Sequence, residues 1–322
     1  MSWIRHKAVI PVAAVAVLTG LAGALLAACE HAPAPSHARQ LRSPFTGEPV
    51  GSLNRVLAVK IDNIVNARPQ TGLSHADLVY VLPVEGGLSR FLAVFSSHYP
   101  HVIGPVRSAR EDDLALLRQF GRPAFAYSGA TATLLPYIHH TANIVNLYSG
   151  IATGYYRDNT RAAPYNLYAH TRQLLAQAAR ASTARDIGFR FGPSPPGGQA
   201  TRSAAVSYPA ASFRFTWSAA KGRWLVSMDG APAVTTGGGR LSPATVVIQH
   251  TTVRTSRFLE YGKPPPYAES TGSGTALVLR GGKAWTTHWS RPHANAGTTY
   301  TTTSGKPMTF APGQVWIILA YR

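Results

Sequence analysis

Short apolar runs, rather than long amphipathic stretches, dominate the first half of the chain. Residues 56–61, 77–84 and 90–95 are each largely apolar and are flanked by polar or turn-forming residues. Runs of this length and composition are typical of buried β-strands. The sequence Glu-Gly-Gly-Leu-Ser at 85–89 lies between the last two runs and predicts a hairpin connection.

The same half carries helical signals. A short apolar run at 101–106 is followed by a polar segment in which Ser108 and Glu111 have the spacing of a capping box. The acidic residues 111–113 suit the positive end of a helix dipole, so we expect a helix over 109–120. Further helical segments are expected at 134–139 and 172–181. Strands and helices together predict an α+β or α/β N-terminal domain with a mixed sheet.

The second half of the chain shows the pattern of strands alone. Apolar and aromatic runs at 213–217 and 223–227 flank a turn at Lys221-Gly222. Similar runs follow at 246–249, 276–279, 284–286 and 315–319. This pattern predicts a mostly antiparallel, all-β C-terminal domain.

Aromatic residues are frequent in this half of the chain. The larger ones are Trp217, Trp224, Trp285, Trp289, Tyr300 and Trp316. Aromatic side chains on strands commonly pack in a core, and we expect that use here. The alternative is that some of them stack on sugars at a partly wet sheet face.

Changes in composition divide the chain. A segment rich in Ala, Pro, His and Arg follows Cys29 and has no apolar periodicity, and a Pro- and Gly-rich segment begins at 191. We therefore expect a signal peptide over 1–28, a disordered tether over 29–43, an N-terminal domain over 44–190, a linker over 191–203 and a C-terminal domain over 204–322.

The N-terminal segment predicts export and lipidation. Arg5 and Lys7 precede 21 residues without a charge, and Leu-Ala-Ala-Cys at 26–29 resembles the cleavage signal of bacterial lipoproteins. We expect Cys29 to carry lipid and to anchor the protein at the extracytoplasmic face of the membrane. An ordinary secretory signal and an uncleaved membrane helix remain alternatives. Because Cys29 is the only cysteine, disulfides and thiol catalysis in the folded domains are excluded.

Charge narrows the range of partners. The chain has a formal net charge of +18, which falls to about +16 when Arg5 and Lys7 leave with the signal. A basic protein outside the cytoplasm meets anionic lipids and wall polymers, so we expect no nucleic-acid partner. The alternative is that the basicity is only compositional, because no dense block of basic residues occurs.

Candidate ligand-binding residues lie at predicted strand ends and in loops, where sites on sheets are commonly found. They are Asp62, Asn63, Arg68, Asp77, Glu85, Arg90, Arg107, Ser108, Arg110, Arg157, Asp158, Arg161 and Asn166. Arg107 and Arg110 flank the expected helix start, where guanidinium groups and free N–H groups can hold a phosphate or carboxylate. The alternative is that these arginines pair with the nearby acids and only fix loops.

Several motifs in order resemble one family. They are residues 60–63, 67–73, 85–87, 104–110 and 163–168, and in the second half 246–249, 272–274, 282–283 and 312–316. These segments resemble the YerB-like lipoproteins, the family of domain of unknown function 3048. The resemblance implies a lipid-anchored envelope protein with two such domains, and it brings no established activity.

Signatures of catalysis are absent from the sequence. It contains no His-Glu-x-x-His, no zinc-type Cys/His spacing and no Gly-x-Ser-x-Gly, and we predict no metal and no cofactor. The leading hypothesis is a non-catalytic binding or scaffolding module for an anionic or glycan ligand, with a wall polymer or an envelope protein as partner.

The alternative is a metal-assisted phosphoryl or glycosyl-phosphate transferase that resembles the LytR-CpsA-Psr enzymes. In that analogy Asp77 helps to hold a divalent metal, and Arg90 and Arg107 neutralise a pyrophosphate. The Pro-Arg-Asp signature of those enzymes is missing, because Ser108 follows Arg107.

Overall fold

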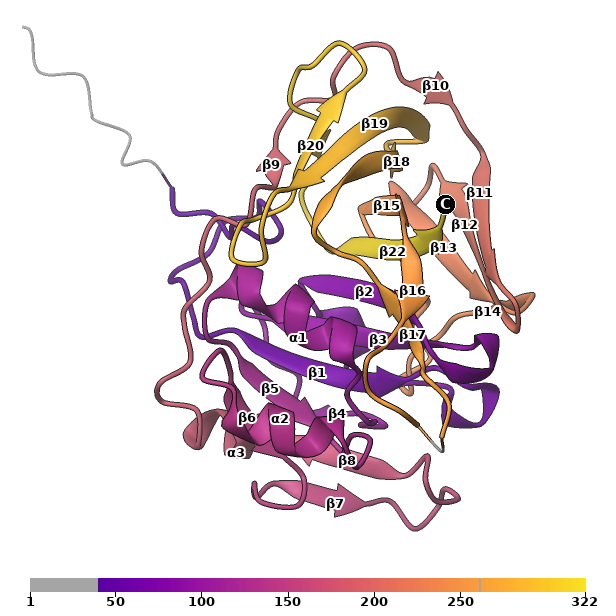
Figure 1. Cartoon of the computed structure of the whole chain (residues 1–322). Coiled ribbons are helices and arrows are strands. Elements are labelled where there is room, and N and C mark those ends of the chain that lie inside the picture. The colour runs from indigo at the N-terminus through magenta and orange to yellow at the C-terminus, as the bar shows by residue number, and fades with distance from the viewer. Residues whose placement is uncertain (1–39, 261) are drawn as a thin grey trace, which may run out of the picture. The chain divides into compact units, whose positions relative to one another are not determined.

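One mixed sheet runs through both halves of the chain. The computed structural model describes residues 40–260 and 262–322 (Figure 1). The predicted signal, Cys29 and the tether up to residue 39 lie outside the described residues. Within the described ranges, no helix is both long and apolar enough to cross a membrane.

The main sheet has 11 strands in the order β10-β19-β18-β15-β22-β2-β3-β1-β5-β6, with β20 paired to β19. The strands are β1 (Leu57–Asp62), β2 (Leu78–Pro83), β3 (Ser89–Phe95), β5 (Ala124–Tyr127), β6 (Val145–Tyr148), β10 (Gln199–Ala200), β15 (Thr245–Thr251), β18 (Gly272–Arg280), β19 (Lys283–Arg291), β20 (Thr299–Thr302) and β22 (Val315–Tyr321).

The last strand joins the two halves of the sequence. β22 pairs in parallel with β2, where Ile317 lies opposite Tyr80, and in parallel with β15, where Ile317 lies opposite Val247. The first six of its seven residues are buried, as expected for a strand covered on both faces. The protein is therefore mostly β with a mixed sheet. The finer split into an α/β domain and an all-β domain remains a prediction.

The predicted hairpin between the second and third apolar runs is confirmed. β2 and β3 are antiparallel and are joined through the short 3-10 helix η3 (Glu85–Gly87). Gly86 and Gly87 have φ angles of +68° and +71°, a conformation that glycine adopts without the steric cost of a side chain.

Three short α-helices lie between residues 40 and 190. They are α1 (Glu111–Leu117), α2 (Leu134–His140) and α3 (Thr171–Ala176), and α1 continues into the 3-10 helix η4 (Arg118–Phe120). The prediction that Ser108 caps α1 is wrong. Arg110 precedes the first turn, and its N–H donates to Asp113 Oδ2 at 2.7 Å. The third helix ends five residues before the predicted residue 181.

Smaller sheets flank the main one. Their strands are β4 (Val102–Ile103), β8 (Leu167–His170) and β7 (Tyr155–Arg157); β11 (Ser203–Tyr208), β12 (Ala211–Ser218), β13 (Arg223–Met228) and β14 (Ala231–Pro232); β16 (Val253–Thr255) and β17 (Pro266–Ala268); and β9 (Arg190–Phe191) with β21 (Thr309–Phe310). In Figure 1 the β16–β17 hairpin extends from the second half of the chain toward α1.

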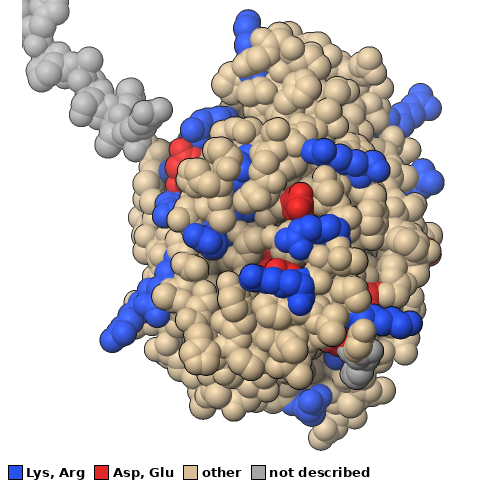
Figure 2. Space-filling model, viewed as in Figure 1, with Lys and Arg blue, Asp and Glu red and all other residues tan. Residues whose placement is uncertain are grey.

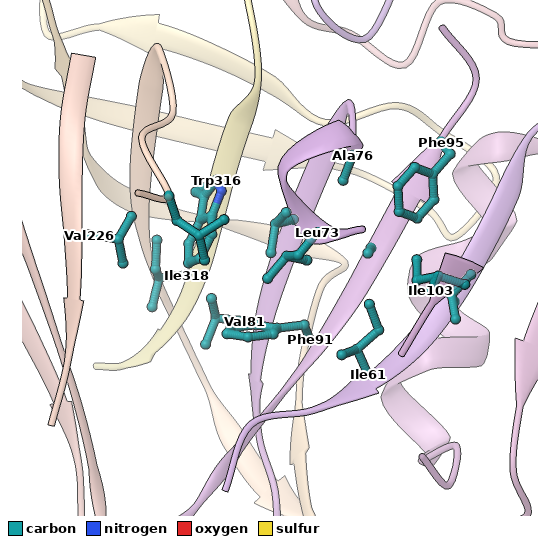
Figure 3. Close-up of a cluster of buried hydrophobic side chains, with 14 of the residues drawn as sticks. Ile61, Leu73, Ala76, Val81, Phe91, Phe95, Ile103, Val226, Trp316 and Ile318 are labelled. Atoms are coloured by element: carbon teal, nitrogen blue, oxygen red, sulfur yellow. The ribbon is translucent and has the colours of Figure 1, made fainter. Parts of the chain in front are cut away.

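A continuous apolar core crosses the boundary predicted from composition. Figure 3 shows Val226, Trp316 and Ile318 from the second half beside Val81 and Phe91 from the first. The rings of Phe91 and Trp316 meet edge to face, with their centroids 5.5 Å apart.

The predicted core role of the aromatic residues is confirmed for five of them, because Trp224, Trp285, Trp289, Tyr300 and Trp316 are buried. Trp217 is half-buried and packs against Trp224.

The segments predicted as tether and linker contain ordered contacts where they are described. Arg42 forms an isolated bridge with Pro49, and Ser43 is buried. The linker range includes β10, which pairs with β19. The predicted domain boundaries are therefore crossed by strand pairing, and independent domains remain a prediction.

Candidate functional site

An open cleft of about 810 Å³ lies at the end of the β2–β3 hairpin. Its charged lining residues are Asp62, Glu85, Arg90, Arg107, Arg110, Glu260 and Lys263. Its apolar and aromatic lining comes from Ile64, Val84, Leu88, Tyr165, Pro209, Pro264, Pro265, Pro266 and Tyr321. The cleft therefore combines opposite charges with an apolar wall, and both halves of the sequence contribute to it.

Asp62 lies between two guanidinium groups. It ends β1 directly opposite Arg90 on β3. Its Oδ2 is 2.8 Å from Arg107 Nε, without the alignment of a hydrogen bond, and its Oδ1 is 4.0 Å from Arg90 Nε. Oδ1 also accepts the N–H of Asn63 at 2.9 Å. One carboxylate is thus shared by two cations.

Arg90 is the deeper of those two cations. Its Nη1 donates to the carbonyl oxygen of Ser108 at 3.2 Å. Burial, and next the positive charge of Arg110, lower the pKa of Arg90 to about 10, against the opposing effects of Asp62 and Glu85. The group is still cationic at neutral pH.

Arg110 is committed to internal contacts. Its Nε donates to Glu85, its Nη1 donates to the carbonyl of Ala109 at 2.8 Å, and its Nη2 lies 3.5 Å from Glu260 Oε1. Burial alone would raise the pKa of Glu85, but the hydrogen bond and charge of Arg110 lower it below its usual value. Arg110 therefore links the hairpin turn to the loop after β16.

Arg107 is the arginine most available to a ligand. Its side chain is 25% exposed, against 10% for Arg90 and 3% for Arg110. Its guanidinium carbon lies 5.8 Å from the centre of the Tyr165 ring. It also lines a second pocket, together with Ser108 and Arg157.

Asp77 lies away from this cleft, at the opposite ends of the strands. β1 and β2 both run antiparallel to β3, so the start of β2 is far from the end of β1. Asp77 Oδ2 accepts the N–H groups of Ser96 and Ser97 at 2.5 and 2.9 Å. Burial raises the pKa of Asp77 to about 6. The metal-holding role proposed for Asp77 beside Arg90 and Arg107 therefore does not fit this geometry.

Several of the remaining candidates hold loops together. Arg68 donates to Asn63 and lies 2.8 Å from Asp229 Oδ2. Arg161 Nη2 donates to the carbonyl of Arg68 at 2.8 Å.

The other three candidates form two local contacts. Arg157 Nη1 donates to Asn166 Oδ1 at 2.7 Å, and Asp158 accepts from Thr160. For Arg68, Arg161 and Asp158, these contacts favour the structural alternative.

The cleft also contains residues that the sequence did not single out. Glu260 and Lys263 come from the segment between β16 and β17, together with the run Pro264-Pro265-Pro266. A triple proline directly after Lys263 was the visible signal in this segment. What placed it here is the folding of the β16–β17 hairpin onto α1, which no local pattern reveals.

A buried charge cluster beneath the cleft was also missed. Lys60 Nζ lies 2.6 Å from Asp113 Oδ1, and both side chains are fully buried. Neither carboxylate oxygen of the neighbouring Asp112 has a hydrogen-bond partner in the described part of the chain. Burial raises the pKa of Asp112 to about 7; next in size, Lys60 lowers it and Asp113 raises it. In residues 40–260 and 262–322, no three His, Cys, Asp or Glu side chains gather in a way that would hold a metal ion.

Family comparisons agree with this fold. A model described as the N-terminal domain of a protein of unknown function (DUF3048) matches residues 45–185, and the model of the C-terminal domain of the same family matches residues 204–317. Together these matches cover most of the chain, so the protein belongs to the DUF3048 family.

A relative and a solved structure are both from Bacillus subtilis. The protein described as "Putative lipoprotein YerB" of strain 168 is 44% identical over 100 residues, which is 30% of this chain and 30% of that protein. The crystal structure of the YerB protein matches with a TM-score of 0.74 at 23% identity, covering 87% of this chain and 96% of that one. That structural likeness shows the fold alone.

Proposed function

We propose that this protein is a lipid-anchored binding module of the bacterial envelope, whose cleft around Arg107 takes an anionic glycan. The observation that carries the proposal is the partly exposed side chain of Arg107 beside an apolar wall in an open cleft of about 810 Å³. Anchoring through Cys29 is supported by the sequence signal and by the description of the Bacillus subtilis relative as a lipoprotein.

The charge balance around Arg107 favours an anion. Arg110 is neutralised by Glu85 and Glu260, whereas Arg90 and Arg107 share the single carboxylate of Asp62. The three arginines and the three carboxylates of the cleft balance, but two of the carboxylates lie at Arg110 and only one is shared by Arg90 and Arg107, so positive charge prevails near Arg107, and the exposed Lys263 makes the whole lining net positive. A ligand carboxylate or phosphate at Arg107 would form charge-assisted hydrogen bonds.

The rest of the lining favours a ligand with a flat, partly apolar body. Tyr165, Tyr321 and the prolines from 264 to 266 offer rigid surfaces on which the C–H faces of sugar rings can pack. By contrast, Figure 2 shows that Lys and Arg side chains are dispersed over the visible face rather than gathered in one block. The proposal therefore rests on the cleft and not on the overall charge.

Binding to wall material tests this proposal. Purified residues 40–322 are titrated with soluble peptidoglycan fragments and with anionic wall polymer by calorimetry. Arg107→Ala is expected to weaken binding about tenfold to a hundredfold, because a hydrogen bond to a charged group contributes about 1.5–3 kcal/mol. Arg214→Ala, an exposed arginine on β12, is the matched control and is expected to leave binding unchanged.

Equal binding by the Arg107→Ala protein, or no binding by the unmodified protein, would contradict the proposal.

Anchoring through Cys29 is tested separately in cells. Labelling with radioactive palmitate is expected for the full chain and is expected to be lost in Cys29→Ala, and label retained by that variant would rule out lipidation at this residue.

A second candidate, transfer of a phosphoryl or glycosyl-phosphate group, is favoured by one observation. Asp62 lies within 4.0 Å of Arg90 and 2.8 Å of Arg107 in an open cleft, an arrangement that can hold a polar reacting group. The test is turnover of a polyprenyl-pyrophosphate-linked glycan with added divalent cation. Turnover that is lost in Asp62→Asn would support an enzyme, and its absence in the unmodified protein would reject one.

A further inference from the structure

A second, strongly polar pocket of about 440 Å³ shares Arg107 with the cleft. We propose that this pocket is a phosphate subsite, so that the ligand of the protein is a phosphate-bearing glycan. The inference rests on the proposed function for the identity of the whole ligand, but it makes its own claim about phosphate. The pocket residues that carry it are Arg107, Ser108, Ser128, Ser149, Tyr156 and Arg157.

The place of the pocket in the sheet favours a ligand site. β1, β5 and β6 are parallel neighbours, so their carboxyl ends meet at one edge of the sheet. Ser128 directly follows β5, and Ser149 directly follows β6. The carboxyl edge of parallel strands is where ligands commonly bind in open sheets, because loops there can converge without interrupting the strands.

Backbone contacts hold these loops in fixed positions. The N–H of Arg107 donates to the carbonyl of Lys60 at 2.9 Å, which ties the loop to β1. The N–H of Ser128 donates to the carbonyl of Arg107 at 3.0 Å, and Ser149 Oγ donates to the carbonyl of Ser128 at 3.2 Å. The pocket wall is therefore preorganised by the sheet, so little ordering is needed when a ligand binds.

The lining of this pocket carries positive charge and no carboxylate, although Arg107 also lies 2.8 Å from Asp62 Oδ2 of the neighbouring cleft. Two guanidinium groups, Arg107 and Arg157, contribute to the pocket, and no Asp or Glu is among its lining residues. Arg157 donates to the neutral amide oxygen of Asn166, and the described residues show no ion pair for it. This contact orients the guanidinium and leaves its charge for a ligand.

The kinds of donor favour a tetrahedral oxyanion. Two half-buried serines, Ser108 and Ser128, can donate from their hydroxyl groups beside the two arginines, whereas the hydroxyl proton of Ser149 is already donated to the carbonyl of Ser128. Hydroxyl groups and guanidinium forks that approach from several sides match the several acceptor oxygens of a phosphate better than the two oxygens of a carboxylate. Because Arg107 lines both spaces, a phosphate here would lie directly beside a sugar in the cleft.

The test separates this subsite from the cleft. Backbone amide shifts of residues 40–322 are followed by NMR during titration with inorganic phosphate, and in parallel with acetate. Phosphate is expected to shift residues around Ser128 and Ser149 with millimolar affinity, and acetate is expected to bind at least several-fold more weakly. Arg157→Gln, which lines only this pocket, is expected to weaken phosphate binding about tenfold. Lys263→Gln, which lines only the cleft, is the matched control and is expected to leave phosphate binding unchanged.

The outcomes distinguish the two proposals. If phosphate binding depends on Arg157 but no glycan binds, the subsite stands and the proposed function fails. If a phosphate-free glycan binds as tightly as a phosphate-bearing one, or if phosphate binds Arg157→Gln unchanged or fails to bind the unmodified protein, the subsite is rejected. Both proposals are supported if Arg157→Gln and Lys263→Gln each lose binding to a phosphate-bearing glycan, while only Arg157→Gln loses binding to inorganic phosphate.

Discussion

Asp112 makes the stability of the folded protein depend on pH. Its pKa is about 7 in the folded state, against a usual value of 3.8, because it is buried. The folded state therefore holds this proton more tightly than the unfolded chain does. Consequently, the contribution of this group to the free energy of unfolding falls as the pH rises from about 4 to about 7 and stays low above that.

Replacing Asp112 by Asn removes the cost of this buried charge. We expect Asp112→Asn to be more stable than the unmodified protein by about 4 kcal/mol at pH 8 and by only about 1 kcal/mol at pH 4.5. Urea denaturation of residues 40–322 at the two pH values measures both differences. A difference of the same size and sign at both pH values would show that ionisation of Asp112 is not its cause.

The ion pair of Lys60 and Asp113 gives a second prediction. Removing one partner of a buried pair leaves an uncompensated charge, so we expect Lys60→Met to lose about 3–5 kcal/mol of stability. The double variant Lys60→Met, Asp113→Asn is expected to regain most of that loss, because the new amide oxygen still accepts the N–H of Arg110. Urea denaturation midpoints of the two variants measure these stabilities. An equal loss of stability in the single and the double variant would contradict the prediction.

At the scale of elements, the β16–β17 hairpin is held onto α1 by one carboxylate. Glu111 Oε2 accepts from Ser256 Oγ at 2.6 Å and from the N–H of Arg257 at 3.1 Å, and its Oε1 lies 2.8 Å from Arg257 Nε. The segment between the two strands supplies Glu260 and Lys263 to the cleft. The position of this segment beside the cleft should therefore depend on Glu111.

We expect Glu111→Gln to loosen the hairpin without unfolding the sheet. Hydrogen exchange over residues 253–268 should become about tenfold faster, corresponding to about 1.4 kcal/mol, while β2 and β3 keep their protection. Glu269→Gln, which breaks an exposed pair with Arg254 at the base of the same hairpin, is the matched control with little expected effect. Equal exchange in the two variants would reject the role of Glu111.

Local elements were largely predictable, and their partners were not. The apolar runs of the first half predicted β1, β2 and β3, and the glycines at 86 and 87 predicted the hairpin turn. The start of α1 was misplaced because the capping hydrogen bond is made by Asp113, whose carboxylate accepts the N–H of Arg110, and not by Ser108. The pairing of β22 with β2 joins residues more than two hundred positions apart, and no local pattern specifies such a contact.

The candidate site likewise contains residues that the sequence predicted and residues that it did not. Asp62 and Arg90 meet because β1 and β3 pair in an antiparallel register that places them opposite each other, although β2 lies between these two strands in the sequence. Asp77 was grouped with them because it begins a predicted strand and because of the resemblance to the LytR-CpsA-Psr enzymes, and strand direction separates it from them. Glu260 and Lys263 reach the cleft through long-range packing, so their role was not visible beforehand.

For the whole molecule, the position of β22 between β2 and β15 predicts that the two halves fold together. Residues 40–190 alone would expose the edge of β2 that β22 covers, including Leu78 and Val81. We expect this fragment to show no cooperative thermal unfolding, and we expect co-expression with residues 191–322 to yield a complex that unfolds cooperatively. A stable, cooperatively unfolding 40–190 fragment would instead establish an independent N-terminal domain.

The central claim is that an envelope glycan binds through Arg107. The most direct test is the dissociation constant of residues 40–322 for a phosphate-bearing wall glycan, measured by calorimetry for the unmodified protein and for Arg107→Ala. Because Arg107 lines both the cleft and the phosphate pocket, we expect Arg107→Ala to bind about tenfold or more weakly, and we expect this difference to diminish at high salt. Unchanged affinity in Arg107→Ala, or no measurable binding by the unmodified protein, would contradict it.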